Sequence, residues 1–330
     1  MTAPLEEHSS ADRGYYHRTA FGLALSIDPR ISIQGLGQSL LPASTGPASR
    51  VRLDADELNR RWEAVMSAPT RARELRFGEE LLLSVDFAEP TGYLMWARDF
   101  GRILIARDGL ELLCEPEPGI ESWANILAFQ ALPLAATIRG LEVMHASGVV
   151  LDGGAVLVAG PPGAGKSSLA AALVRAGGQL LSDDAVALQL SNDELIAHAG
   201  STVLQLRALE DQRLSEQERT ALGQQASSVA DKHRYVSDVA PQPAPLAGLF
   251  LLQRSSEQPA VERLAAVDPF ELIASTFNLS VRTPARLQRQ LDVVSAIAAG
   301  GLAHRLRVQP GVDATELAAL IQAHLAVVTT

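Results

Sequence analysis

The sequence feature that most constrains this chain is the stretch at residues 160–167, which reads GPPGAGKS. It matches the pattern G-x-x-x-x-G-K-[ST] at every required position. The glycines let the backbone turn so tightly that several N–H groups point inward at phosphate oxygens. The helix expected from Lys166 onward adds the positive end of its dipole. We therefore expect a phosphate-binding loop between a strand and a helix, the alternative being a chance glycine-rich turn.

Each residue of the loop has an expected role. Lys166 is expected to reach the β- and γ-phosphates, and Ser167 to offer its hydroxyl to Mg²⁺. Lys166 and Lys232 are the only lysines in the sequence, so a lysine at this position is unlikely to be accidental. The residues expected to bind phosphate are Gly160, Pro161, Pro162, Gly163, Ala164, Gly165, Lys166, Ser167 and Ser168.

A pair of acids, Asp183 and Asp184, follows the loop in the stretch LLSDDAVAL. A helix over residues 166–176 would descend about 16 Å from the phosphate edge, and a strand over 179–182 would climb back about 13 Å. The pair is therefore expected at the carboxyl edge of the sheet, beside the loop. One carboxylate could accept a proton from a hydroxyl while the other holds Mg²⁺ directly or through water. The alternative is a capped strand end with two solvated acids.

Spacing separates the classes of protein that use such a loop. A GTP switch needs a guanine-reading N-K-x-D type element, and DKHR around Lys232 is not one. An ATP motor usually carries its acid after four apolar strand residues, well downstream of the loop. Here Ser182 precedes the pair, and the pair follows Lys166 by 17 residues. The arrangement favours a kinase.

Composition narrows the partners and the compartment. A formal net charge of -10 argues against nucleic acid as the main partner, because no basic stripe is available to neutralise its phosphates. The single cysteine, Cys114, fits a reducing compartment. The first residues lack the cationic start and apolar core of a signal peptide, and the longest apolar segment, 126–138, is short and contains Pro133. We expect a cytoplasmic protein without a membrane partner, and homo-oligomerisation stays open.

The layout of the chain predicts two parts. Residues 1–120 are expected to form an accessory or substrate-recognition region of α+β type, with an antiparallel sheet over about 80–115 after partly disordered residues to about 30. Residues 121–330 are expected to form an α/β P-loop kinase core, a mixed sheet flanked by helices. Within that core, the polar segment 213–231 is expected to be a mobile lid or substrate loop.

The stretch at residues 144–188 resembles the catalytic domain of the bacterial HPr kinase/phosphorylase. Three features carry the resemblance together: His145 opens a hairpin 21 residues before Lys166, the phosphate loop follows, and Asp183-Asp184 come 17 residues after that lysine. The family's later Glu-x-Arg-Gly signature is absent from this sequence, which puts phosphorolysis in doubt. The layout before the loop looks more like the HPr-kinase-related proteins found with peptide natural products, which include kinases of lasso precursor peptides.

The resemblance implies residue roles. Asp183 would take the proton from an acceptor serine, Asp184 would lie near the metal, and His145 would lie beside the transferred phosphate. Lys166 and Ser167 keep the roles given above. Three further residues are candidates: Glu210 as a metal ligand, and Arg234 and Arg254 as groups that neutralise charge on the transferred phosphate, the alternative for each arginine being a surface position.

These features together predict an ATP- and Mg²⁺-dependent kinase that phosphorylates a serine of a peptide or small protein, such as a lasso precursor peptide or an HPr-like protein. Two alternatives stay open. One is a P-loop kinase of small molecules, although such enzymes usually begin at the phosphate-loop strand. The other is an ATP-binding regulatory protein that transfers no phosphate.

Overall fold

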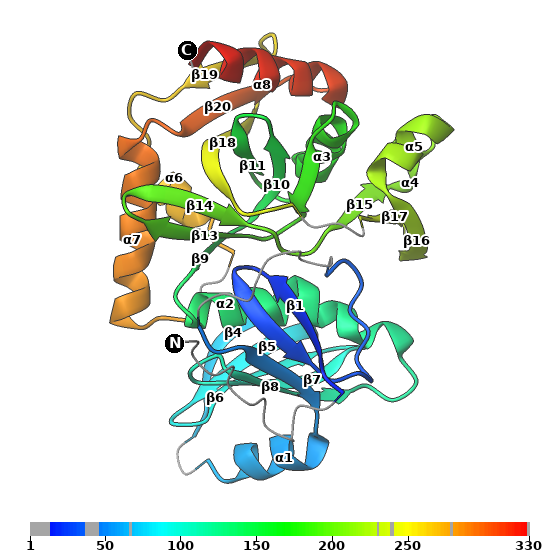
Figure 1. Cartoon of the computed structure of the whole chain (residues 1–330), viewed down its shortest axis with the longest axis vertical. Helices are drawn as coiled ribbons and strands as arrows, with labels where there is room; N and C mark the ends of the chain where they lie inside the picture. The colour runs from blue at the N-terminus through cyan, green and yellow to red at the C-terminus, as the bar shows by residue number, and fades with distance from the viewer. Residues whose placement is uncertain are drawn as a thin grey trace, which may run out of the picture.

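The computed structural model describes residues 14–36, 46–65, 68–229, 231–237, 241–277 and 280–328, without the side chains of 227–229 and 328. The chain forms two bodies stacked along its long axis (Figure 1). One body is an N-terminal sheet with its covering helices, and the other carries the phosphate loop. Within the described part of the chain, the helices are too short or too polar to cross a bilayer.

The N-terminal body is built on an eight-stranded sheet in the order β1-β2-β3-β8-β7-β6-β5-β4. Its last strands pair antiparallel, over the residues whose alternation of apolar and polar side chains predicts an antiparallel sheet. The sheet as a whole is mixed, because β3 pairs parallel with both β2 and β8. The strands are β1 (Tyr16–Ala20), β2 (Leu23–Ile27), β3 (Ser49–Leu53), β4 (Thr70–Phe77), β5 (Glu80–Ala88), β6 (Gly92–Ala97), β7 (Gly101–Ala106) and β8 (Glu111–Pro116).

Helical turns join the two bodies. Helix α1 (Ala55–Glu63) packs on β8, whereas the 3₁₀ turn η2 (Glu121–Ala124), the π-helix η3 (Leu127–Ala131) and α2 (Leu132–Ile138) follow the sheet. Pro133 is tolerated because it lies in the first turn of α2. The buried side chains of η3 and α2 share one hydrophobic core with the N-terminal strands, and that core continues into Val143, Ala185 and Ala187 of the second body. The division of domains at residue 120 stays a prediction.

The second body is built on a nine-stranded mixed sheet in which β11 lies between β10 and β18. Strand β10 pairs antiparallel with both β11 and β12, so β11 and β12 run in the same direction with β10 between them. The strands are β9 (Glu142–Met144), β10 (Ala146–Leu151), β11 (Gly154–Ala159), β12 (Gln179–Ser182), β13 (Val186–Ser191), β14 (Glu194–His198), β18 (Ala244–Arg254), β19 (Ala260–Arg263) and β20 (Ala303–Val308).

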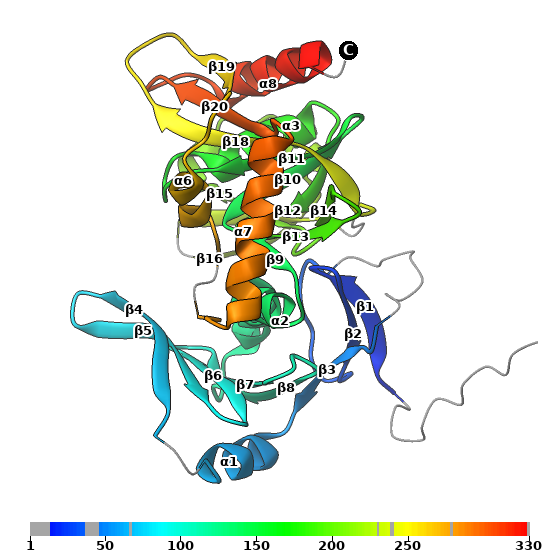
Figure 2. The same cartoon turned by 90° about the vertical axis from the view of Figure 1, so that its left-hand side faces the viewer.

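Helices cover both faces of this sheet. On one face, α3 (Lys166–Arg175) and α8 (Ala314–Val328) pack together over β11, β18 and β20. On the other face lie α6 (Pro269–Ala274) and α7 (Pro284–Ala299), and Figure 2 shows α7 running down towards α2. This arrangement is the mixed sheet flanked by helices that the sequence predicts.

A small third sheet lies beside the phosphate-loop helix. Its order is β15-β17-β16, formed by β15 (Val203–Arg207), β16 (Gln224–Val229) and β17 (Lys232–Val236). The short helices α4 (Ala208–Asp211) and α5 (Glu216–Leu222) connect β15 to β16.

One expectation from the sequence is wrong in this structure: residues 14–30 are not disordered, because Tyr16–Ala20 and Leu23–Ile27 pair as strands. Segment 213–231 contains ordered elements, since Ser215 and Glu218 form a capping box that starts α5 and β16 follows. Its role as a mobile lid or substrate loop stays a prediction. Residues 1–13 and 230 lie outside the described residues.

Candidate active site

The phosphate loop connects the end of β11 to the start of α3. Gly163 and Gly165 adopt left-handed backbone conformations, with φ of 76° and 100°, which side chains with a Cβ rarely adopt. Helix α3 begins at Lys166, as the sequence predicts, and its apolar side buries Leu169 and Leu173 against the sheet. The N-terminal end of α3 therefore carries free N–H groups directly beside the loop.

Lys166 lies at the centre of the loop and is 8% exposed. Its Nζ donates to the carbonyl oxygen of Gly160 at 2.9 Å and lies 3.2 Å from Nε2 of His145. Because an ammonium only donates, Nε2 of His145 accepts and Nδ1 carries the ring proton. Burial lowers the pKa of Lys166, and the carboxylates of Asp184 and Asp183 oppose that shift.

His145 is held by contacts on both sides of its ring. Its Nδ1 lies 3.0 Å from the carbonyl oxygen of Asp184 and 3.3 Å from that residue's Oδ1. Phe277 packs near the ring, with the two ring centroids 6.0 Å apart. The histidine thus bridges the phosphate-loop lysine and the second acid of the pair, a contact between residues far apart in the sequence.

Asp183 follows β12 and is 5% exposed. Its Oδ1 accepts from the hydroxyls of Ser147 at 2.6 Å and Ser167 at 3.0 Å, and its Oδ2 accepts from the backbone N–H of Gln205 at 3.3 Å. Burial raises the pKa of Asp183, and the hydrogen bond from Ser147 opposes that shift. The carboxylate therefore lies in contact with the phosphate-loop serine.

Asp184 differs from its neighbour in exposure and in backbone conformation. Its side chain is 46% exposed, and its φ of 74° lies in the left-handed region, which is uncommon for a residue with a Cβ. Such conformations cost on the order of 1 kcal/mol or more and concentrate at functional sites. The turn at Asp184 keeps one acid beneath the loop and the other at its opening.

The donors at this position suit Mg²⁺. Within the described part of the chain there is no group of three or more histidines, cysteines or acids that could hold a metal by itself. Mg²⁺ usually keeps several waters and binds one or two carboxylates together with substrate phosphates. Ser167, Asp183 and Asp184 supply that limited set of oxygens, so a metal here would need the phosphates of a nucleotide to complete its shell.

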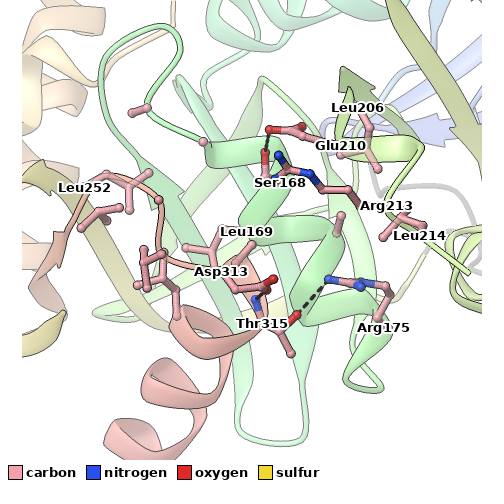
Figure 3. A pocket seen from close by; sticks show the side chains of 18 of the residues that line it. Ser168, Leu169, Arg175, Leu206, Glu210, Arg213, Leu214, Leu252, Asp313 and Thr315 are labelled. Carbon is pink, nitrogen blue, oxygen red and sulfur yellow. Dashed lines mark hydrogen bonds between the residues drawn. The ribbon is translucent and has the colours of Figure 1, made fainter. Parts of the chain in front are cut away.

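A pocket of about 360 Å³ opens on the other side of the start of α3. Figure 3 shows Ser168, Leu169 and Glu210 along its wall, and Arg213, Asp313 and Thr315 complete much of the rim. Its volume is in the range of small-molecule sites, which are about 300–1,000 Å³. The pocket combines apolar surface with a few charged groups next to the phosphate loop.

Glu210 belongs to this pocket. Its Oε1 accepts from the hydroxyl of Ser168 at 2.9 Å, and Figure 3 draws this contact. The structure thus brings Ser167 to Asp183 and Ser168 to Glu210. A metal-binding role for Glu210 stays a prediction, because its contact is to Ser168 and not to the serine expected to bind Mg²⁺.

The two candidate arginines lie in different places. Arg254, at the end of β18, donates through Nη2 to the carbonyl oxygen of Gly163 at 3.1 Å, so it lies at the rim of the phosphate loop. Arg234 lies in β17 directly opposite Gln205 of β15, whose N–H binds Asp183. Arg234 is 2% exposed and is therefore not a surface arginine.

Comparison with known proteins gives a match over the part of the chain that contains the phosphate loop. Residues 156–234 match the model of a family described as an AAA domain. The solved structure of the HPr(Ser) kinase/phosphatase from Coxiella burnetii is 14% identical and covers 57% of this chain and 99% of that chain, with a TM-score of 0.30. That score is too low to transfer residue roles. No curated protein is similar enough in sequence to count as a relative.

The matched segment contains the phosphate loop, the acid pair and Arg234. Over these residues the chain is therefore similar to a P-loop NTPase domain, the kind of domain that binds a nucleotide.

Sequence reasoning missed several residues of this site. Ser147 and Gln205 hold Asp183, and Phe277 lies against His145. For Ser147 a signal exists, because His145 and Ser147 are two residues apart at the start of a strand and so lie on the same face. Gln205 and Phe277 have no local signal, because only the fold brings them to the acid pair.

Proposed function

We propose that this protein is an ATP- and Mg²⁺-dependent kinase that transfers the γ-phosphate of the nucleotide to a serine hydroxyl of a peptide or small protein. The observation that carries the proposal is the contact between Asp183 and Ser167, with Oδ1 and Oγ 3.0 Å apart. It supports a carboxylate within proton-transfer reach of a phosphate held by the loop.

In this proposal Asp183 is the base. The acceptor's serine oxygen forms a bond to the γ-phosphorus, the bond from that phosphorus to the β–γ bridging oxygen breaks, and ADP leaves with the electron pair. The hydroxyl proton passes to Asp183, whose Oδ1 already accepts hydrogen bonds from two serine hydroxyls. Burial raises the pKa of Asp183, and a raised pKa makes a carboxylate a better proton acceptor.

The remaining residues position and neutralise charge, which is most of what phosphoryl transfer requires. Lys166 would contact the β- and γ-phosphates, and His145 would lie beside the transferred group. Ser167 and Asp184 would hold Mg²⁺, which when bound neutralises charge on the phosphates. Arg254 would approach the phosphates from the rim of the loop.

The nucleoside end of ATP is assigned to the 360 Å³ pocket. The pocket begins at Gly165 and Ser168, so a nucleotide whose phosphates occupy the loop can enter it without a break. Apolar side chains such as Leu169 and Leu252 would face the base, while Arg213 and Asp313 could hydrogen-bond the sugar or the ring edge.

The serine acceptor rests on the resemblance of residues 144–188 to HPr kinase/phosphorylase, and a lasso precursor peptide rests on the layout of the N-terminal region. Asp184 is a second candidate for the base, because its side chain is 46% exposed and reaches the opening of the site. Transfer to a small molecule, and ATP binding without transfer, are the alternatives that the test below separates.

The test is transfer of labelled phosphate. The full chain is incubated with γ-labelled ATP, Mg²⁺ and candidate acceptors, namely HPr and precursor peptides, and mass spectrometry then locates the phosphate. The proposal expects phosphoserine on one acceptor and none with Lys166→Ala. ATP binding without any labelled peptide or protein product would contradict it.

A further inference from the structure

Two arginines, Arg234 and Arg73, form no ion pair with a carboxylate within the described part of the chain. Arg234 is 2% exposed, and within the described part of the chain its Nε and Nη2 have no hydrogen-bond partner. Burial lowers its pKa. The equally buried Arg286, by contrast, pairs with Glu142 at 2.7 Å. A guanidinium buried with unused donors is costly, so these donors call for a partner such as an anion or a water.

Arg234 lies on the strand next to the one that contacts Asp183. It is the direct cross-strand partner of Gln205, whose backbone N–H binds Oδ2 of Asp183. Directly opposite residues in antiparallel strands have Cα atoms about 5 Å apart. The Cζ atom of Arg234 lies over the Phe129 ring, 5.4 Å from its centroid.

Arg73 approaches the same place from the N-terminal sheet. It lies in β4, is half-buried, and donates through Nη1 to Oε1 of Gln130 at 3.2 Å. Burial lowers its pKa, and the Asp184 carboxylate is the charge that opposes this shift. Arg73 therefore reaches η3, the segment whose Phe129 lies beside Arg234, from the opposite body of the molecule.

Both arginines contact side chains of the same π-helix, η3. Phe129 and Gln130 are adjacent residues of η3, the π-helix whose Leu127, Ala128 and Ala131 are buried in the N-terminal core. The extra residue of a π-turn changes which side chains leave the helix, and such turns are frequent at functional sites. Here the turn presents an aromatic face to one arginine and an amide oxygen to the other.

We propose that Arg234 and Arg73 form an anion-binding pair on the acceptor side of the site, and that the acceptor serine lies next to a residue that carries an oxyanion, a carboxylate or a phosphate. This inference rests on the proposed function, because it names the chemistry of that acceptor. The phosphates of the nucleotide are a poorer explanation, since Lys166 and Arg254 already contact the phosphate loop. Within the described residues, no hydrogen bond or ion pair joins Arg234 or Arg73 to that loop. Guanidinium groups bind carboxylates and phosphates with their forked donors.

The test measures binding without turnover. Three five-residue peptides with blocked ends carry a central serine flanked on both sides by aspartate, by phosphoserine or by asparagine. Their affinities for the full chain are measured by calorimetry with Mg²⁺ and a non-hydrolysable ATP analogue. At least one anionic peptide is expected to bind about tenfold or more tighter than the asparagine peptide, since hydrogen bonds between charged groups are worth that much.

Variants assign the preference to the arginines. Arg234→Gln and Arg73→Gln are each expected to remove most of it, whereas the control Arg76→Gln should keep it, because Arg76 is an exposed arginine of the same strand that pairs with Glu74. Arg234→Lys keeps the charge and should retain part of the preference. If Arg234→Gln does not fold by circular dichroism, Arg73→Gln and Arg234→Lys decide.

The inference is overturned if wild-type protein does not favour an anionic peptide, if no peptide binds, or if Arg73→Gln and Arg234→Gln keep the preference. It is also overturned if the variants weaken the nucleotide analogue and all peptides alike, which would assign the arginines to the transferred phosphate. Because the assay needs no transfer, an anion preference can be observed even if the kinase proposal fails, and transfer can occur even if the preference is absent.

Discussion

Ser167 and Ser168 are neighbours at the start of α3, yet their hydroxyls donate to carboxylates in two different surroundings. Asp183, the partner of Ser167, is buried and is held by three donors. Glu210, the partner of Ser168, lies in the wall of an open pocket with apolar side chains around it. The first turn of α3 thus separates a closed polar region around Asp183 from an open pocket around Glu210, whose walls are partly apolar and partly charged.

This contrast suggests that proton transfer takes place on the side of Asp183 and that the nucleoside binds on the side of Glu210. Around Asp183, three donors fix the carboxylate while burial raises its pKa, which suits proton transfer. An open pocket with apolar walls suits a ring and a sugar. The predictions that follow test this division, first by removing the element shared by both sides and then by changing each side separately.

Lys166→Ala is expected to have the largest effect, because Lys166 would contact the phosphates of any nucleotide bound in the loop. Loss of a charged contact to phosphate should weaken nucleotide binding by roughly tenfold to a hundredfold and abolish measurable transfer. Binding of a fluorescent nucleotide and transfer of labelled phosphate are the measurements. Lys232→Ala is the matched control, since Lys232 is the other lysine and is exposed. Equal losses in both variants would contradict the prediction.

Asp183→Asn should separate the two sides. Removal of a positioned base usually costs about 10² to 10⁴ in rate, while nucleotide affinity should stay within a few-fold of wild type because the pocket is untouched. Initial rates and nucleotide binding are measured in parallel with Asp184→Asn. If Asp184→Asn loses more rate than Asp183→Asn at saturating Mg²⁺, the base is Asp184 and the assignment is wrong.

The pH dependence of kcat/KM is a second test of Asp183 as the base. A base must be ionised, so activity should fall as pH falls through its pKa. Burial raises the pKa of Asp183, so the acid limb should lie above the pH expected for an ordinary aspartate. The limb is measured from pH-rate profiles of wild type and of Ser147→Ala, in which loss of the hydrogen bond that lowers this pKa should move the limb to still higher pH. A shift to lower pH would contradict the assignment.

Glu210→Gln is expected to have the smallest effect. The amide oxygen of glutamine can still accept from Ser168, so nucleotide affinity should change by a few-fold at most, and the Mg²⁺ concentration that gives half-maximal rate should stay the same. Titration of Mg²⁺ in wild type and variant is the measurement. A large rise in the Mg²⁺ requirement would restore Glu210 as a metal ligand and would break the division between the two sides.

Local sequence was sufficient for the phosphate loop and the elements around it. Gly163 and Gly165 allow a backbone that other residues resist, and the strand at 179–182 has the predicted bounds, so the acid pair emerges beside the loop. The strands within residues 16–27 were missed, because short segments become ordered only when a neighbouring strand satisfies their backbone groups.

Residues 160–184 alone were enough to predict that a glycine-rich loop, a helix of small residues and two acids would meet, because each depends on backbone geometry over a few neighbouring residues. Only the tertiary structure decided that Asp183 is buried beneath Ser147 and Ser167 while Asp184 stays exposed. It also decided that Arg73 of the first body and Arg234 of the second contact adjacent residues of η3. The physical reason is that burial and long-range charge depend on which distant segments pack together, and no local pattern encodes that.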